Sequence, residues 1–299
     1  MIRPTLLCAA ALALFIARPA PADARPLDLR RIPAAAQGVG HLDVDALRKT
    51  ALYRMVKAKV TSGPDKLDID PKLRPLVDAL MRSTHGVSFW VAGNDTGAVL
   101  VEVSGAAAIS ALLDKIPHKT TRVAGHPVRT FREGGEDAMV ALVGDVLIAA
   151  DDARSLERSI KVVTGTAASL KRGALPAAPG GRGLFFFAAL GDRLLDKVKK
   201  EASSTTLQVD MKTLTMDLAE VGGDVRARVI AVMTSAEAAQ KVKSVVDGLL
   251  ALTALADDED VKKVRPLLQK IKVTAAGPRL EVSLAIPPAK LIELVESQR

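Results

Sequence analysis

The sequence predicts an exported α+β protein made of two tandem, similar modules, each a mostly antiparallel sheet backed by helices. Short apolar strands alternate with amphipathic helices along the whole chain. The same order of elements recurs, from about residue 38 to 165 and from about 183 to 297. In each copy this order is strand, helix, strand, strand, helix, strand pair and helix, and it begins with the ferredoxin-like element order. The recurrence predicts an internal duplication, and two unrelated α+β halves are the alternative.

The first 24 residues have the pattern of a secretory signal peptide. Arg3 precedes a 12-residue apolar run from Leu6 to Ala17, and Ala22 to Ala24 form a small-x-small exit. The run is shorter than the roughly 20 apolar residues that a membrane-spanning helix needs. We expect cleavage after Ala24 and a periplasmic or extracellular mature chain without a transmembrane segment. An uncleaved anchor is the alternative.

Composition limits the kinds of site that the mature chain can carry. Cys8 is the only cysteine and lies in the leader, so the mature chain has no disulfide, thiol nucleophile or thiolate metal site. The net charge of +8 favours an anionic surface as partner, although the basic residues are dispersed. Single-strand nucleic-acid binding needs basic patches interleaved with aromatic residues, and the sequence has none. We expect an envelope protein or an anionic surface as partner, no nucleic acid and no cofactor; the oligomeric state stays open.

Four segments follow the leader. Residues 25–37 form a Pro/Arg/Ala-rich lead-in, and residues 171–183, KRGALPAAPGGRG, have the composition of a linker without apolar periodicity. Module one therefore covers residues 38–170, and module two covers residues 184–299.

In module one, the apolar spacing predicts a strand at 39–44 and a helix at 45–60 that Asp45 caps. A second helix at 71–82 and a hairpin of strands 86–92 and 98–103 follow. Ser104 is expected to cap the next helix, to about residue 116. Strands at 121–131, 138–143 and 146–150 then lead to a helix that Asp151 or Asp152 caps.

In module two, we expect a strand at 183–190, a helix at 191–202 and a long strand at 206–219. The apolar alternation of that strand changes phase between Met211 and Leu214, which predicts a bulge or a bend. A strand at 225–233 precedes a helix to about residue 256, with Thr234 and Glu237 as a capping box. A second helical stretch at 261–271, a hairpin of strands 272–276 and 279–286, and a helix at 289–297 complete the module.

The common catalytic motifs are absent from the sequence: it has no P-loop, no Gly-x-Ser-x-Gly elbow and no His-Glu-x-x-His. The polar cluster that stands out is His41, Asp43 and Asp45, since His41 and Asp43 alternate on one strand and so share a face. Such a cluster is able to hold a metal or a polar ligand. The alternative is a solvent-facing strand edge followed by a helix cap.

Consecutive aromatic residues at positions 185–187 point to both faces of a sheet, so each face needs a cover. A helix or the other module is the simpler cover, and an apolar ligand or a second subunit is the alternative. A cavity for an apolar ligand would be lined by residues such as Phe186, Met216, Val246 and Leu249.

Several phrases of the sequence, IPAAAQGVGHLDVDALRKTAL, GAVLVEVSG and ALVGDVLIAADD, resemble uncharacterised secreted proteins of GC-rich bacteria. The resemblance covers mainly residues 32–165 and implies neither an activity nor site residues. From the residues themselves we expect a non-enzymatic binding or scaffold protein of the bacterial cell envelope. A periplasmic carrier of an apolar or amphipathic small molecule and an enzyme of unrecognised type are the two alternatives.

Overall fold

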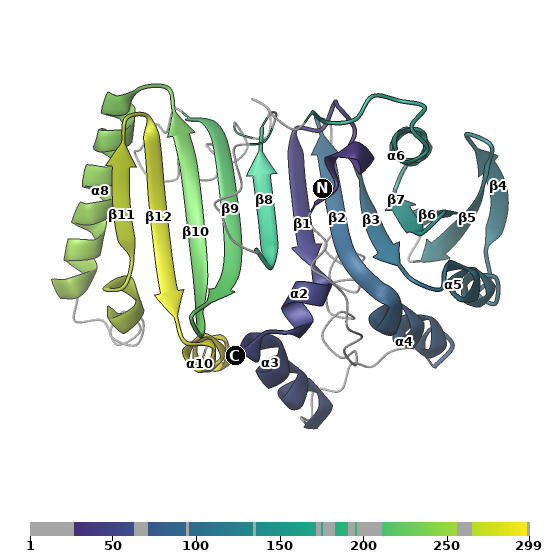
Figure 1. Cartoon of the computed structure of the whole chain (residues 1–299), viewed down its shortest axis with the longest axis horizontal. Helices are drawn as coiled ribbons and strands as arrows, with labels where there is room; N and C mark the ends of the chain where they lie inside the picture. The colour runs from purple at the N-terminus through teal and green to yellow at the C-terminus, as the bar shows by residue number, and fades with distance from the viewer. Residues whose placement is uncertain are drawn as a thin grey trace. The chain divides into compact units, whose positions relative to one another are not determined.

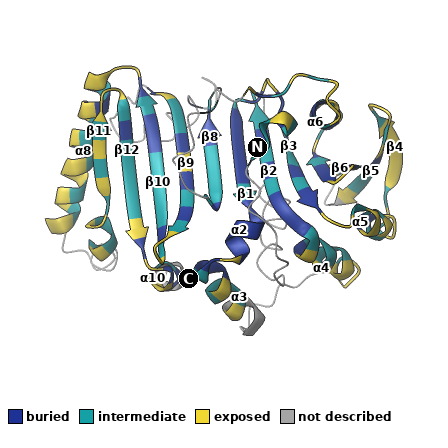
Figure 2. Ribbon diagram, viewed as in Figure 1, coloured by how far each residue is buried: buried dark blue, intermediate teal, exposed yellow. Residues whose placement is uncertain are grey.

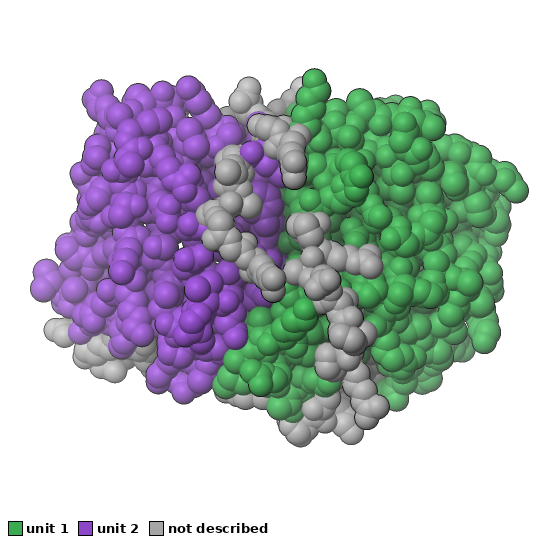
Figure 3. Space-filling model, in the orientation of Figure 1, with its two compact units in different colours: residues 1–174 green, residues 175–299 purple. Residues whose placement is uncertain are grey.

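The structure is a computed structural model, and it divides into two compact units, residues 1–174 and 175–299 (Figure 3). It describes residues 27–62, 71–93, 96–133, 136–171, 183–190, 211–255 and 265–297, together with Leu175 and Leu195. The division falls within the 171–183 segment that the composition predicts to be a linker. The predicted leader lies outside the described residues, as do the helix at 191–202, apart from Leu195, and the first residues of the 206–219 strand.

The first unit contains one antiparallel sheet, in which the described strands lie in the order β1-β2-β3-β7-β6-β5-β4 (Figure 1). The strands are β1 (Gly38–Asp43), β2 (Thr84–Ala92), β3 (Thr96–Val103), β4 (Lys119–Val123), β5 (His126–Glu133), β6 (Glu136–Val143) and β7 (Val146–Ala150).

Helices cover both faces of this sheet. The helices are α2 (Val44–Arg48), α3 (Ala51–Ser62), α4 (Arg74–Ser83), α5 (Ala106–Leu113) and α6 (Ala153–Val163). On one face, Ile109 and Leu113 of α5 pack with Val103 and Val140 of the strands, and two leucines of α4 complete this cluster. On the other face, α6 packs against β3, β6 and β7. In Figure 2, the continuous dark, buried stretches of this unit lie on β1, α2 and part of β2.

The lead-in is part of the first unit. Residues Leu29–Arg31 form a short 3-10 helix, η1, that contacts α6. The side chain of Ile32 is fully buried, and Leu170 N–H donates to the carbonyl of Ile32 at 2.7 Å. Backbone hydrogen bonds to residues 168 and 170 therefore fasten the lead-in to the segment that follows α6.

The second unit contains a smaller antiparallel sheet, with its described strands in the order β8-β9-β10-β12-β11. The strands are β8 (Phe185–Ala189), β9 (Met211–Val221), β10 (Asp224–Met233), β11 (Lys272–Ala276) and β12 (Arg279–Ile286). Helix α8 (Ala236–Leu255) packs along β11 and β12, and α10 (Pro288–Ser297) ends the described chain (Figure 1). Met233, Ala239 and Leu280 lie in the core between α8 and the sheet.

The two sheets share a strand order. In both units the first three strands are neighbours, and the last strand joins the third, so β1-β2-β3-β7-β6 corresponds to β8-β9-β10-β12-β11. All described strand pairs are antiparallel. The α+β class with helix-backed antiparallel sheets is confirmed. Duplication stays a prediction, because the first unit also carries β4 and β5 beyond the common order.

Two elements expected to be single are divided. The strand expected at 121–131 is a hairpin, in which Ala124 and Gly125 take positive φ angles of 48° and 81°. This is the geometry of a two-residue hairpin turn. The sequence gives no clear signal for it, because alanine stands where such turns usually have asparagine, aspartate or glycine. The helix expected at 45–60 is interrupted at Lys49 and Thr50. The hydroxyl of Thr50 accepts from Tyr53 N–H at 3.0 Å and so starts α3 anew.

Three predicted caps move by one or two residues. Asp43, not Asp45, caps α2; Gly105 at φ 67° precedes α5 in place of Ser104; and Ser235, not Thr234, accepts from the first turn of α8. Asp152 caps α6, as expected. The bulge predicted between Met211 and Leu214 is confirmed, because Val232 pairs with Thr213 while Met233 pairs with Met211.

Candidate functional site

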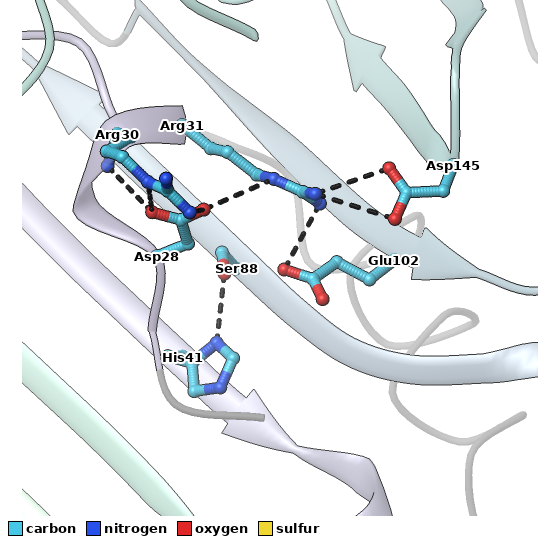
Figure 4. A network of polar contacts seen from close by, with 7 residues as sticks. All are labelled: Asp28, Arg30, Arg31, His41, Ser88, Glu102 and Asp145. Carbon is cyan, nitrogen blue, oxygen red and sulfur yellow. Dashed lines mark hydrogen bonds and ion pairs between the residues drawn. The ribbon is translucent and has the colours of Figure 1, made fainter. Parts of the chain in front are cut away.

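The predicted polar cluster begins on β1, where His41 and Asp43 share one face of the strand, as their alternation predicts. His41 pairs with Ser88 on β2, and its Nδ1 lies 2.9 Å from the Ser88 Oγ (Figure 4). Both side chains are buried rather than solvent-facing. A hydrogen bond between neighbouring strands therefore engages His41.

Asp43 acts as the helix cap. Its carboxylate accepts from the Ala46 N–H at 2.8 Å, which satisfies one of the free donors in the first turn of α2. Burial raises the pKa of the Asp43 carboxyl, while the Ala46 N–H and the nearby His41 act in the opposite direction. The burial cost of the charged form is thus the largest influence on this carboxyl.

Asp45 points into a different set of contacts. Its two carboxylate oxygens lie 3.1 Å from Arg48 Nη1 and 2.8 Å from His85 Nδ1. Arg48 also donates to the carbonyl of Thr84 at 2.8 Å and to the carbonyl of Met81. This Asp45–Arg48–His85 triad is buried, and it ties α2 to the junction of α4 and β2. The structure therefore separates Asp45 from the His41–Ser88 pair.

A second polar network holds the lead-in on the first sheet (Figure 4). Arg31 of η1 lies 3.3 Å from a carboxylate oxygen of Glu102 on β3, and 3.3 Å from one of Asp145 in the turn between β6 and β7. It also lies 3.6 Å from Asp28, whose pKa is lowered by the hydrogen bond from Arg30. Glu102 and Asp145 lie 71 and 114 residues after Arg31 in the chain, so local sequence patterns do not predict these contacts.

The second unit has a charged row on the sheet face opposite α8. Arg228 on β10 is bidentate to Asp217 on β9, at 2.9 and 3.3 Å, and lies 3.7 Å from Glu281 on β12. Arg279 joins Glu281 at 3.1 Å. Alternating cations and carboxylates across neighbouring strands neutralise one another, so this row stabilises strand pairing.

The four apolar residues singled out by the sequence do not line one cavity. Phe186 pairs with Asp217, whereas Met216 pairs with Phe187, so the side chains of Phe186 and Met216 point to opposite faces of the sheet. Val246 and Leu249 lie on α8, where Leu249 is exposed. The alternation of side chains along β8 and β9 is the physical reason for the separation.

Among the described residues, the large apolar side chains with the highest exposure lie on helix α8. Leu249, Leu252 and Leu255 are 54%, 65% and 81% exposed. They occupy the last two turns of the helix, next to a small recess of 170 Å³ between α8 and residues 265–271. We call Leu249, Leu252 and Leu255 the leucine stripe.

The first unit has a wider, open groove on the outer side of α4 and α5, with a volume of 540 Å³. Apolar side chains form its floor, and Arg74, Asp78 and Arg82 of α4 lie along it. The lining residues are Pro71, Arg74, Pro75, Asp78, Ala79, Arg82, Ala108 and Leu112.

The described residues lack two further features. No described helix is both long and apolar enough to cross a membrane. Within the same part of the chain, no three His, Cys, Asp or Glu side chains gather in a way that would hold a metal ion.

No protein-family model matches the sequence, and no curated protein matches it. Solved structures do match the fold. Crystal form I of TP0453 superposes with a TM-score of 0.52 at 10% identity, covering 91% of this chain and 98% of that one. Crystal form III gives a TM-score of 0.52 at 9% identity over 91% and 99% of the two chains. At this identity the likeness concerns the fold alone, and it extends over nearly the whole of both chains.

Proposed function

We propose that the chain is an exported, non-enzymatic binding or scaffold protein of the bacterial cell envelope. The leucine stripe of α8 carries the proposal, because soluble proteins seldom leave large apolar side chains adjacent and exposed unless the surface binds something. The apolar character of the stripe favours a partner protein over an anionic surface, since leucines offer an anion no favourable contact. Export rests on the leader pattern in residues 1–24.

The non-enzymatic part of the proposal draws support from the polar residues of the first unit. Catalytic groups need side chains that are free to meet a substrate in a recess. Here Asp43 caps a helix, Asp45 is shared between Arg48 and His85, and Arg31 is shared among carboxylates. Each of these groups has a structural partner that explains its position.

Site-specific crosslinking tests the binding surface. A photoreactive amino acid at position 252, in the chain expressed in the bacterium that encodes it, should yield a discrete adduct with an envelope protein. The matched control is position 241 of the same helix, which is also exposed and lies about two turns before the stripe begins. Adducts at neither position, or the same adducts at both, would count against the stripe as a binding surface.

Native mass spectrometry of residues 25–299 separates this proposal from the carrier. Extra mass that disappears on denaturation would favour a carrier and identify its cargo. A mass that matches one chain or a whole-number multiple supports surface binding.

A further inference from the structure

The open groove of the first unit carries three charged side chains along one line of α4. Arg74, Asp78 and Arg82 are spaced four residues apart, so they lie on one stripe of the helix at intervals of about 6 Å. All three are exposed. Among the described residues, none of the three has a hydrogen-bonding or ion-pairing partner for its side chain. These three side chains, the charged stripe of α4, thus present an unpartnered pattern of positive, negative and positive charge.

The floor of the groove beside these three charged residues is apolar and shallow in side-chain height. Pro75 and Ala79 of α4 and Ala108 of α5 are small or compact, so the backbone of another helix is able to approach closely. Leu112 adds an apolar contact at the α5 side. Helix-in-groove recognition combines such a floor with charges on the rim that set partner and direction.

We propose that the groove receives α4 of a second copy of this chain, forming an antiparallel two-fold dimer. In a two-fold interface, a residue i that contacts j is matched by j contacting i. If two antiparallel stripes are offset by one helical turn, Asp78 of each copy faces an arginine of the other. The plus-minus-plus pattern is therefore complementary to itself, and this self-complementarity selects a second copy as the occupant.

The expected dimer is weak, because the groove spans only about three helical turns. Small interfaces fall below the roughly 1,200 Å² of typical stable complexes, so we expect a dissociation constant in the micromolar range. Since the rim pairs are exposed, association should weaken about tenfold or more when salt rises from 0.05 to 0.5 M, as screening shortens the range of charge interactions. This inference goes beyond the proposed function, which does not require self-association.

The experiment is sedimentation velocity on residues 25–299, at about 1 to 300 μM. One variant, Asp78→Arg, makes the stripe uniformly positive. A second, Arg74→Glu with Arg82→Glu, makes it uniformly negative. Each alone should be monomeric throughout this range, and a 1:1 mixture should recover a dimer. The matched control is Arg154→Glu, an exposed arginine on α6 outside the groove, which should dimerise like the wild-type chain.

Circular dichroism and Trp90 fluorescence establish that each variant is folded. A wild-type chain that stays monomeric to 300 μM at low salt would overturn the proposal, whatever other protein occupies the groove. A wild-type dimer that Asp78→Arg leaves intact would place self-association on another surface and overturn it as well. So would single-sign variants that are monomeric alone and fail to associate when mixed.

Discussion

The imidazole Nδ1 of His85 lies 2.8 Å from the carboxylate Oδ2 of Asp45, a residue 40 positions earlier in the chain. The other carboxylate oxygen of Asp45 lies 3.1 Å from Arg48. One buried carboxylate therefore joins α2 to the beginning of β2, and the guanidinium of Arg48 extends this link to the carbonyl groups that end α4. The triad therefore connects α2, the end of α4 and the beginning of β2.

Asp45→Ala should destabilise the first unit strongly. The substitution leaves the Arg48 guanidinium buried without its carboxylate, a situation that costs about 3–5 kcal/mol in other proteins. Urea unfolding followed by the fluorescence of Trp90, the only tryptophan of the chain, measures the effect on this unit. Asp151→Ala, at an exposed position of the same unit, is the control, with a change of less than about 0.5 kcal/mol. Equal midpoints for the two variants would contradict the role of the triad.

The sequence predicted the positions of the helices and strands better than the contacts between them. A short apolar run after Gly144 and Asp145 located β7 at residues 146–150, and a change of phase located the bulge of β9. Local patterns suffice there because a strand buried on both faces is a short apolar run, and a strand buried on one face has a period of two. The hairpin turn at Ala124 was missed because alanine rarely takes a positive φ, so its turn follows from tertiary context.

The candidate site shows the same limit. His41 and Asp43 share a face as predicted, because strand geometry is local. The partners of the polar side chains could not be predicted. Ser88 faces His41 only through the register of β1 and β2. Likewise, Glu102 meets Arg31 of the second network only when the lead-in packs on the sheet. Contacts between residues distant in the sequence depend on the register of the strands, and local sequence patterns do not determine that register.

Arg31→Gln should loosen the lead-in, whereas Arg30→Gln should not. Arg31 faces Glu102, whose side chain is only 9% exposed, so its loss leaves a largely buried carboxylate without this cation. We expect a loss of about 1–2 kcal/mol. Arg30 is 88% exposed, and its partner within the described part of the chain is Asp28; exposed pairs of this kind contribute little.

Limited proteolysis at the N-terminus, together with urea unfolding, measures both variants. Arg31→Gln should be trimmed faster between residues 27 and 37 than the wild-type chain, and Arg30→Gln should match the wild type. Identical trimming of all three chains would show that the network does not hold the lead-in.

Ser159→Ala tests how α6 is joined to the sheet. The buried indole N–H of Trp90 donates to the Ser159 hydroxyl at 3.0 Å, and alanine removes that acceptor without disturbing the helix. An unsatisfied buried donor costs about 1–3 kcal/mol. Fluorescence-detected unfolding should shift by that amount and the emission maximum should change, while Glu157→Ala on the exposed side of α6 should alter neither. An unchanged midpoint for Ser159→Ala would mean that water replaces the hydroxyl.

Asp43→Asn should change how stability depends on pH. Burial raises the pKa of Asp43 in the folded chain, so between the ordinary carboxyl pKa and this raised value the folded state binds more protons than the unfolded state. The free energy of unfolding contributed by Asp43 therefore falls as pH rises through that window, and the loss persists at higher pH. Asparagine keeps the cap acceptor for the Ala46 N–H but carries no charge.

Urea unfolding of both chains between pH 3.5 and 7.5 measures this contribution. Relative to the wild type, Asp43→Asn should gain stability as pH rises and reach a constant advantage near neutrality. Asp152→Asn is the matched control, because Asp152 also caps a helix but is less buried. A gain with pH that both variants share would therefore not come from the burial of Asp43. A relative stability of Asp43→Asn that stays flat or falls with pH would mean that the cap and His41 outweigh the burial of Asp43.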